Sequence, residues 1–75
     1  MTPKLPAVTA KELVRVAERL GFVFRRQRGS HAVYVRASDQ GPLVIPMHTG
    51  ELKRKTLRAI IQDLRITVEE FRELL

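Results

Sequence analysis

The sequence contains no cysteine and only two histidines among its 75 residues. Without thiols the chain can form neither a disulfide nor a thiolate zinc site, and two histidines alone argue against a structural metal site. The absence of cysteine is also compatible with a reducing cytosol. We therefore expect a protein that uses no metal and no cofactor.

Long hydrophobic runs are missing as well. Residues 1–8 lack the apolar stretch of a signal peptide, and no segment approaches the length needed to span a bilayer. A cytoplasmic protein without a membrane partner is expected, with one domain over residues 1–75 and residues 1–8 as an N-terminal lead. A chain this short buries only about 60% of its unfolded surface, so its core should be thin.

Acidic residues are scarce in the middle of the chain. Residues 22–58 contain only Asp39 and Glu51 as acids, against eight lysines and arginines, whereas the remainder carries six charges of each sign. The whole net charge of +6 therefore lies in this segment. A basic block on an otherwise balanced surface is typical of polyanion binding, because cations that neutralise phosphates release condensed counterions.

Capping patterns and apolar spacing predict the helices. Residues 9–12, Thr-Ala-Lys-Glu, form a capping box before an amphipathic stretch, and residues 67–70, Thr-Val-Glu-Glu, repeat that pattern before a short terminal helix. Apolar residues at helical spacing predict another helix from about residue 51 to 64, with Thr49 or Gly50 as its N-cap.

Between the first two helices, three short segments are rich in Val, Phe, Ile and Tyr. They cover residues 22–27, 30–36 and 42–47, and residues 28–29 and 37–41 separate them. We predict an α+β fold: a three-stranded antiparallel sheet with two helices packed on one face, in the order α-β-β-β-α, plus the short C-terminal helix.

A two-residue hairpin loop at residues 28–29 would place Arg26 opposite His31, and a second loop centred on Asp39 would place His31 opposite Met47. The helix-covered face then collects Phe22, Phe24, Val33, Val35, Leu43 and Ile45. Tyr34 is expected on the other face. In this register, His31, Arg26 and Met47 lie at the end of the helix-covered face, close to the start of the second helix.

The start of that helix favours phosphate binding. Lys53, Arg54 and Lys55 occupy the first turn, where the positive end of the helix dipole disfavours cations. Free amides together with cations form an anion site, although a charge run exposed to solvent is the simpler alternative. The candidate phosphate-binding residues are Arg25, Arg26, Arg28, Ser30, His48, Lys53, Arg54, Lys55 and Arg58.

His31 is the candidate catalytic residue, because imidazole is the side chain best suited to proton transfer near neutral pH. The alternative is a polar residue that ends a strand. Ser30 is not expected to act with His31 as nucleophile and base, since adjacent strand residues point to opposite faces. His48 is interpreted as a turn or helix-start residue, with phosphate contact or a second proton transfer as the alternative.

The sequence resembles the HicA toxin family of toxin–antitoxin systems over about residues 11–75. The resemblance is carried by Gly29-Ser30-His31, by Pro46-Met47-His48 and by the run from Glu51 to Ile60 that contains Thr56-Leu57-Arg58. It implies a fold like that of the double-stranded-RNA-binding domain, cleavage of mRNA, a HicB-type antitoxin partner and catalysis by His31. Lys55 is a departure, because the family commonly has glycine before Thr-Leu.

The mechanism expected from these residues is metal-independent RNA cleavage. The basic block has no acidic cluster that would supply metal ligands, so the 2′-hydroxyl of the RNA would attack the adjacent phosphate while cations hold it. One alternative is a non-catalytic RNA-binding module with the same fold. Another is an interaction subunit that binds an acidic protein and no nucleic acid.

Overall fold

The chain folds as helix, three strands, helix and helix. A computed structural model describes residues 4–37 and 41–75, and its elements are α1 (Ala10–Arg19), β1 (Val23–Arg28), β2 (His31–Val35), β3 (Leu43–Pro46), α2 (Arg54–Leu64) and α3 (Val68–Leu74). The strands form one antiparallel sheet in the order β1-β2-β3. The predicted α+β class is confirmed, and every strand begins and ends within one residue of its predicted bounds.

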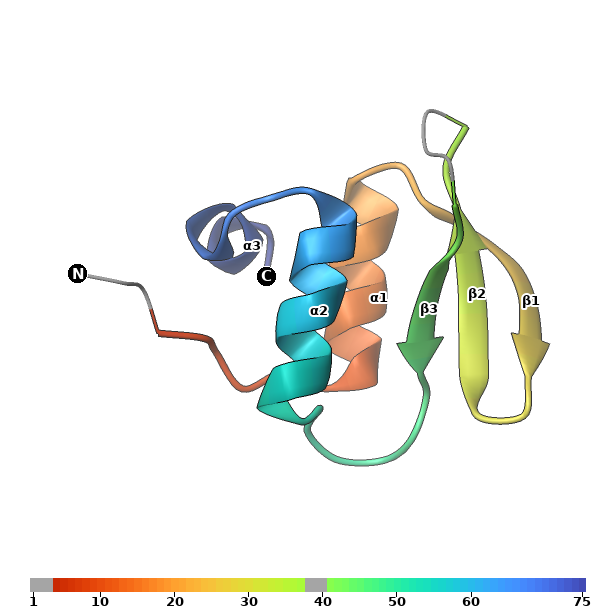
Figure 1. The fold of residues 1–75 in the computed structure, drawn as a ribbon, viewed down its shortest axis with the longest axis horizontal. Coiled ribbons are helices and arrows are strands. Elements are labelled where there is room, and N and C mark those ends of the chain that lie inside the picture. Colours follow the sequence, from red (N-terminus) through yellow and green to blue (C-terminus); the bar gives the residue numbers. More distant parts are fainter. Residues whose placement is uncertain (1–3, 38–40) are drawn as a thin grey trace.

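The elements form three layers (Figure 1). The sheet is one layer, α1 and α2 lie on one of its faces, and α3 lies on the far side of these helices. Both α1 and α2 contact β3, and α3 contacts α1, where the Arg19 guanidinium donates to the Leu74 carbonyl oxygen at 3.0 Å. The opposite face of the sheet carries none of these helices, and we call it the outer face.

Both predicted capping boxes are present. At the start of α1 the Thr9 hydroxyl accepts from the Glu12 amide, and the Glu12 carboxylate accepts from the Thr9 amide at 2.9 Å. Thr67 and Glu70 make the same reciprocal pair at the start of α3. Each box satisfies backbone donors that the first turn of a helix leaves free.

The start of α2 differs from its prediction. Its N-cap is Lys53, rather than Thr49 or Gly50. The preceding residues are held in an extended conformation, because Glu51 pairs with Thr9 in an isolated bridge and the Leu52 amide donates to the Val8 carbonyl oxygen at 2.8 Å. This pairing with the N-terminal segment delays the helix by three residues.

The core between the sheet and the helices is apolar throughout. Its fully buried side chains include Val8, Leu13, Val16, Leu43, Ile45, Leu57, Leu64 and Phe71. Leu5 is buried as well. The described part of the N-terminal lead therefore contributes to the core, which partly offsets the small size of the chain.

The hairpin register is two residues away from the predicted one. The turn consists of Gly29, at φ 56°, and Ser30, so His31 lies opposite Arg28 instead of Arg26. Farther along β1 the pairing slips between Phe24 and Arg26, which leaves Arg25 as the extra residue of a β-bulge. Neither the turn position nor the bulge was predicted.

The predicted faces of β2 are also wrong, because its pairing with β3 is one residue away from the predicted one. Tyr34, rather than Val35, pairs with Leu43. Ala32 and Tyr34 point into the core, while His31 and Val33 belong to the outer face. Strand β2 is apolar on both sides after its first residue, so alternation did not indicate which side the helices cover. The centre of the predicted second loop, Asp39, lies outside the described residues.

Tyr34 is buried and makes an edge-to-face contact with Phe24, with ring centroids 5.6 Å apart. Its burial, and secondly the Glu18 carboxylate, raise the pKa of the phenol above its ordinary value of 10.0. Phe24 itself is 55% exposed, although it was predicted under the helices. Strand β1 is an edge strand, and the helices do not reach over it.

Candidate active site

An open cleft of about 610 Å³ lies between β3 and α2. Its walls come from the start of β2, the outer side of β3, the connection that follows β3, and one side of α2. The lining residues are His31, Val44, Pro46, His48, Leu52, Lys53, Lys55, Thr56, Ala59, Ile60 and Asp63. Both histidines of the chain therefore line one cleft.

His31 is the first residue of β2 and is exposed. Its position is fixed from both sides, because Arg28 of β1 and Pro46 of β3 are its partners across the sheet. The carbonyl oxygen of the preceding Ser30 accepts from the Met47 amide. This bond joins the hairpin turn to the end of β3 and brings His31 next to the connection that carries His48.

The structure corrects the environment predicted for His31. Neither His31 nor Arg26 lies on the helix-covered face, because the observed register turns both toward the outer face. Met47, in contrast, packs against the core as predicted. His31 shares the cleft with the start of α2, and Val44 and Pro46 of β3 also line it.

The first turn of α2 supplies the positive charge of the cleft. Lys53 and Lys55 both line it, and this turn contains no acidic residue. The N-cap residue Lys53 makes no side-chain hydrogen bond to the helix. The positive end of the helix dipole, uncapped amides and two ammonium groups thus lie in the same place, as an anion site requires.

The remaining cations of α2 do not line this cleft. Lys55, Ala59 and Asp63 recur every four residues and form the side of α2 that faces the cleft. Arg54 and Arg58 are exposed elsewhere on the helix. Asp63 was not predicted to belong to the site. Its spacing of eight residues from Lys55 places both on the same side of a helix, which could have indicated its position.

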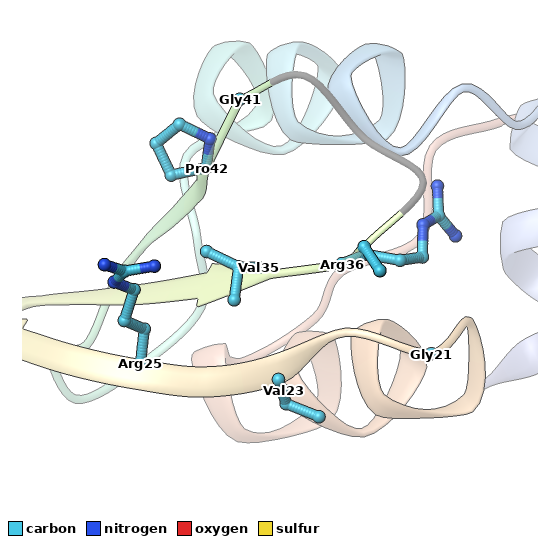
Figure 2. A pocket seen from close by; sticks show the side chains of 8 residues that line it. Gly21, Val23, Arg25, Val35, Arg36, Gly41 and Pro42 are labelled. Carbon is cyan, nitrogen blue, oxygen red and sulfur yellow. The ribbon is translucent and has the colours of Figure 1, made fainter.

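The arginines of β1 form a second basic region. Arg25 and Arg26 line a shallow pocket of about 230 Å³ with Val33, Val35 and Pro42 on the outer face. Figure 2 shows Arg25 also beside Val35 and Pro42 in an adjoining open pocket of about 670 Å³. Arg26, which was predicted to converge with His31 and the start of α2, therefore lies in a region separate from the cleft, and Arg28 lies between the two regions as the strand partner of His31.

Arg36 has a different role from the other cations of the basic block. Its guanidinium donates to the Leu20 carbonyl oxygen at 2.7 Å and lies 4.3 Å from the centre of the Phe22 ring. It thereby stabilises the turn after α1, where Gly21 adopts a φ of 95°.

Among residues 4–37 and 41–75, no three His, Cys, Asp or Glu side chains are grouped so that they could hold a metal ion. In the same part of the chain, no helix is long and apolar enough to cross a membrane.

The fold and the cleft define a small basic α+β protein in which two histidines and two lysines share one open site. A family model described as the HicA toxin of bacterial toxin–antitoxin systems matches residues 10–66, from the first residue of α1 to just before α3. The chain therefore belongs to the HicA toxin family, and this membership implies an antitoxin partner. A search of curated proteins returned no match.

Proposed function

We propose that this toxin is an endoribonuclease that cleaves mRNA in the cytoplasm without a metal ion, and that His31 transfers a proton in the reaction. The observation that carries the proposal is the position of His31 in one cleft with His48, Lys53 and Lys55. A proton-transfer group beside a phosphate site is the minimum that RNA cleavage requires.

In the proposed step, the 2′-oxygen of the RNA attacks the adjacent phosphorus. The bond from phosphorus to the 2′-oxygen forms and the bond to the 5′-oxygen breaks, which leaves a 2′,3′-cyclic phosphate and a 5′-hydroxyl. One group accepts the proton of the 2′-hydroxyl, and another donates a proton to the leaving 5′-oxygen. His31 and His48 share these two transfers, since both line the cleft.

The phosphate that reacts is held at the start of α2. Lys53 and Lys55 stabilise the negative charge that develops on its oxygens, and the uncapped amides of the first turn assist. Arg28 and Ser30, next to His31 in the hairpin, contact the neighbouring nucleotide. Arg54 and Arg58 attract the polyanion from the exposed part of α2 and contact its phosphates less directly than the two lysines.

The antitoxin is proposed to be an acidic protein of the HicB type that covers this cleft. Charge complementarity would steer it to Lys53 and Lys55, and occlusion of His31 would block substrate directly. RNA and antitoxin should then exclude each other in a competition titration. A stable ternary complex with RNA bound at undiminished affinity would rule out occlusion. If antitoxin displaces RNA, charge reversal at Lys53 and Lys55 tests whether the antitoxin contacts the cleft directly or acts on it from a distance.

The central experiment compares His31→Ala with wild type in cells and in vitro. Induced wild type should arrest growth and yield RNA fragments with cyclic phosphate ends, in the presence of a chelator as well. His31→Ala should abolish arrest and cleavage while its circular dichroism and most of its RNA affinity are retained. Arg15→Ala, an exposed change on α1, is the control and should behave as wild type.

Full toxicity of folded His31→Ala would contradict the catalytic assignment and favour a non-catalytic RNA-binding module. A chelator that stops cleavage would contradict the metal-independent step while leaving His31 in place. His48→Ala tests the second proton transfer, and retention of full cleavage by this variant would remove His48 from the mechanism.

A further inference from the structure

Three arginines of β1 point to the same side of the sheet, and we call Arg25, Arg26 and Arg28 the arginine strip. Arg26 and Arg28 pair with Val33 and His31, which are outer-face residues. In a regular strand Arg25 would point the opposite way. The bulge instead leaves Arg25 on the outer face, beside Val35 and Pro42 (Figure 2).

The strip lies beside apolar surface that the helices leave uncovered. Val23 is 60% exposed and Val44 is 42% exposed. Among the described residues assigned here to the outer face, none is acidic. Like charges that are neighbours on one face of a sheet repel each other, so an arrangement of three arginines favours an anionic partner.

The strip is continuous with the cleft. Val44 and Pro46 line the cleft, and they pair with Val33 and His31 of β2. The same two residues of β2 pair on their other side with Arg26 and Arg28. Two rows across the sheet therefore connect the walls of the cleft with the arginine strip, and neighbouring strands are only about 4.8 Å apart.

We infer that the outer face is a second RNA subsite, which binds the single-stranded flank of a substrate whose reacting phosphate occupies the cleft. This inference rests on the proposed function. Guanidinium planes stack on unpaired bases as well as binding phosphates, and exposed valines offer apolar contact to the same bases. The bases of a duplex are stacked and paired, so a duplex would interact with this surface mainly through electrostatic attraction to its phosphates.

The test measures RNA binding separately from cleavage. In a His31→Ala background, fluorescence anisotropy follows binding of a single-stranded RNA of about 12 nucleotides and of one of about four nucleotides, at several salt concentrations. Arg25→Ala/Arg26→Ala should flatten the dependence of log affinity on log salt by about 1.4 units for the longer RNA, since each lost phosphate contact removes about 0.7. The shorter RNA should be unaffected.

The matched control is Arg15→Ala/Arg72→Ala, which removes the same charge from exposed helical positions outside both basic regions. Arg25→Lys/Arg26→Lys keeps the charge and removes the planar groups. This pair should keep the salt slope but weaken binding of the longer RNA. With active protein, Arg25→Ala/Arg26→Ala should raise KM for the longer RNA and leave kcat unchanged.

Equal slopes for the alanine pair and the control pair would overturn the subsite, provided that circular dichroism shows both variants folded. Equal dependence of a duplex on Arg25 and Arg26 would overturn the single-strand assignment. Loss of antitoxin binding alone would assign the strip to the protein partner instead. Failure of wild type to cleave RNA would contradict the proposed function, whereas the binding measurements would still decide the role of the strip.

Discussion

The three helices of this protein begin in two opposite ways. Helices α1 and α3 each start with a threonine cap and a reciprocal glutamate, and α3 has a second acid, Glu69, in its first turn. Helix α2 starts at Lys53 with no side-chain cap and no acid in its first turn. The first arrangement stabilises a helix start, whereas the second leaves its amides and positive dipole available to a ligand.

This difference separates the part of the molecule that maintains the fold from the part that binds substrate. The capped start of α1 lies beside His48 in a separate pocket, whereas only the uncapped start of α2 lines the cleft that holds both histidines. A helix start that gives up stabilising contacts next to a candidate catalytic residue is what a functional site is expected to show.

Reversal of charge at α2 should have the largest effect. Lys53→Glu/Lys55→Glu removes the phosphate-binding cations, so cleavage should fall on the order of 100-fold or more. The same change places acids at the positive end of the helix dipole, which should raise the free energy of unfolding by about 0.3–1 kcal/mol per residue. The cleavage rate in kinetic assays should therefore fall, while the free energy of unfolding measured by urea denaturation should rise. A parallel loss of activity and stability would show that these lysines support the fold.

The salt dependence of RNA binding should distinguish the two sides of α2. Lys53→Ala/Lys55→Ala should flatten the log–log salt slope by about 1.4 units for a single-stranded RNA. Arg54→Ala/Arg58→Ala removes the same charge from the side away from the cleft and should flatten it less. If both pairs change the slope equally, the helix binds RNA as a diffuse charged surface without a defined phosphate site.

The capped starts should show the reverse behaviour. Thr9→Ala or Thr67→Ala removes one capping hydroxyl, which typically costs about 1 kcal/mol in the free energy of unfolding. Cleavage by folded Thr67→Ala should be unchanged, because Thr67 lines neither the histidine cleft nor the pocket that Thr9 shares with His48. Chemical denaturation and activity at low temperature measure the two quantities separately. A drop in kcat for folded Thr67→Ala would show that the two parts are not independent.

The smallest expected effect concerns the buried phenol beside α1. Because the pKa of Tyr34 is raised in the folded state, the unfolded chain loses its proton first as pH rises above about 10. The phenol thus lowers stability progressively from pH 10 upward, and it has no such effect at neutral pH. Thermal denaturation should show that Tyr34→Phe loses less stability than wild type between pH 7 and alkaline pH. An unchanged alkaline profile would contradict this effect.

The sequence predicted which residues form the candidate site better than it predicted how those residues are arranged. His31, His48, Lys53 and Lys55 were all named from their chemistry, and the structure places them in one cleft. Arg26 was assigned to the same cluster and lies instead on the outer face beside Arg25. The error follows from the pairing of β2 with β3, because a shift of one residue turns every side chain of a strand to the other face.

The start of α2 was misplaced for a related reason. Local preferences of Thr49 and Gly50 suit a helix cap, but the pairing of residues 51 and 52 with the N-terminal segment prevails. More than 40 positions in sequence separate these partners, and no pattern within either segment indicates that they meet.

The sequence by itself determined the order and type of the elements, the two capped helix starts, the position of the basic block and the identity of the histidines. These features depend on interactions within a few residues, such as capping, apolar spacing and backbone propensity. The tertiary structure alone decided which face of β2 the helices cover, where α2 begins, and how the basic block divides into a cleft and an arginine strip. Those outcomes depend on pairing between distant segments, and strand β2, which is apolar on both sides, permits more than one register until the core is packed.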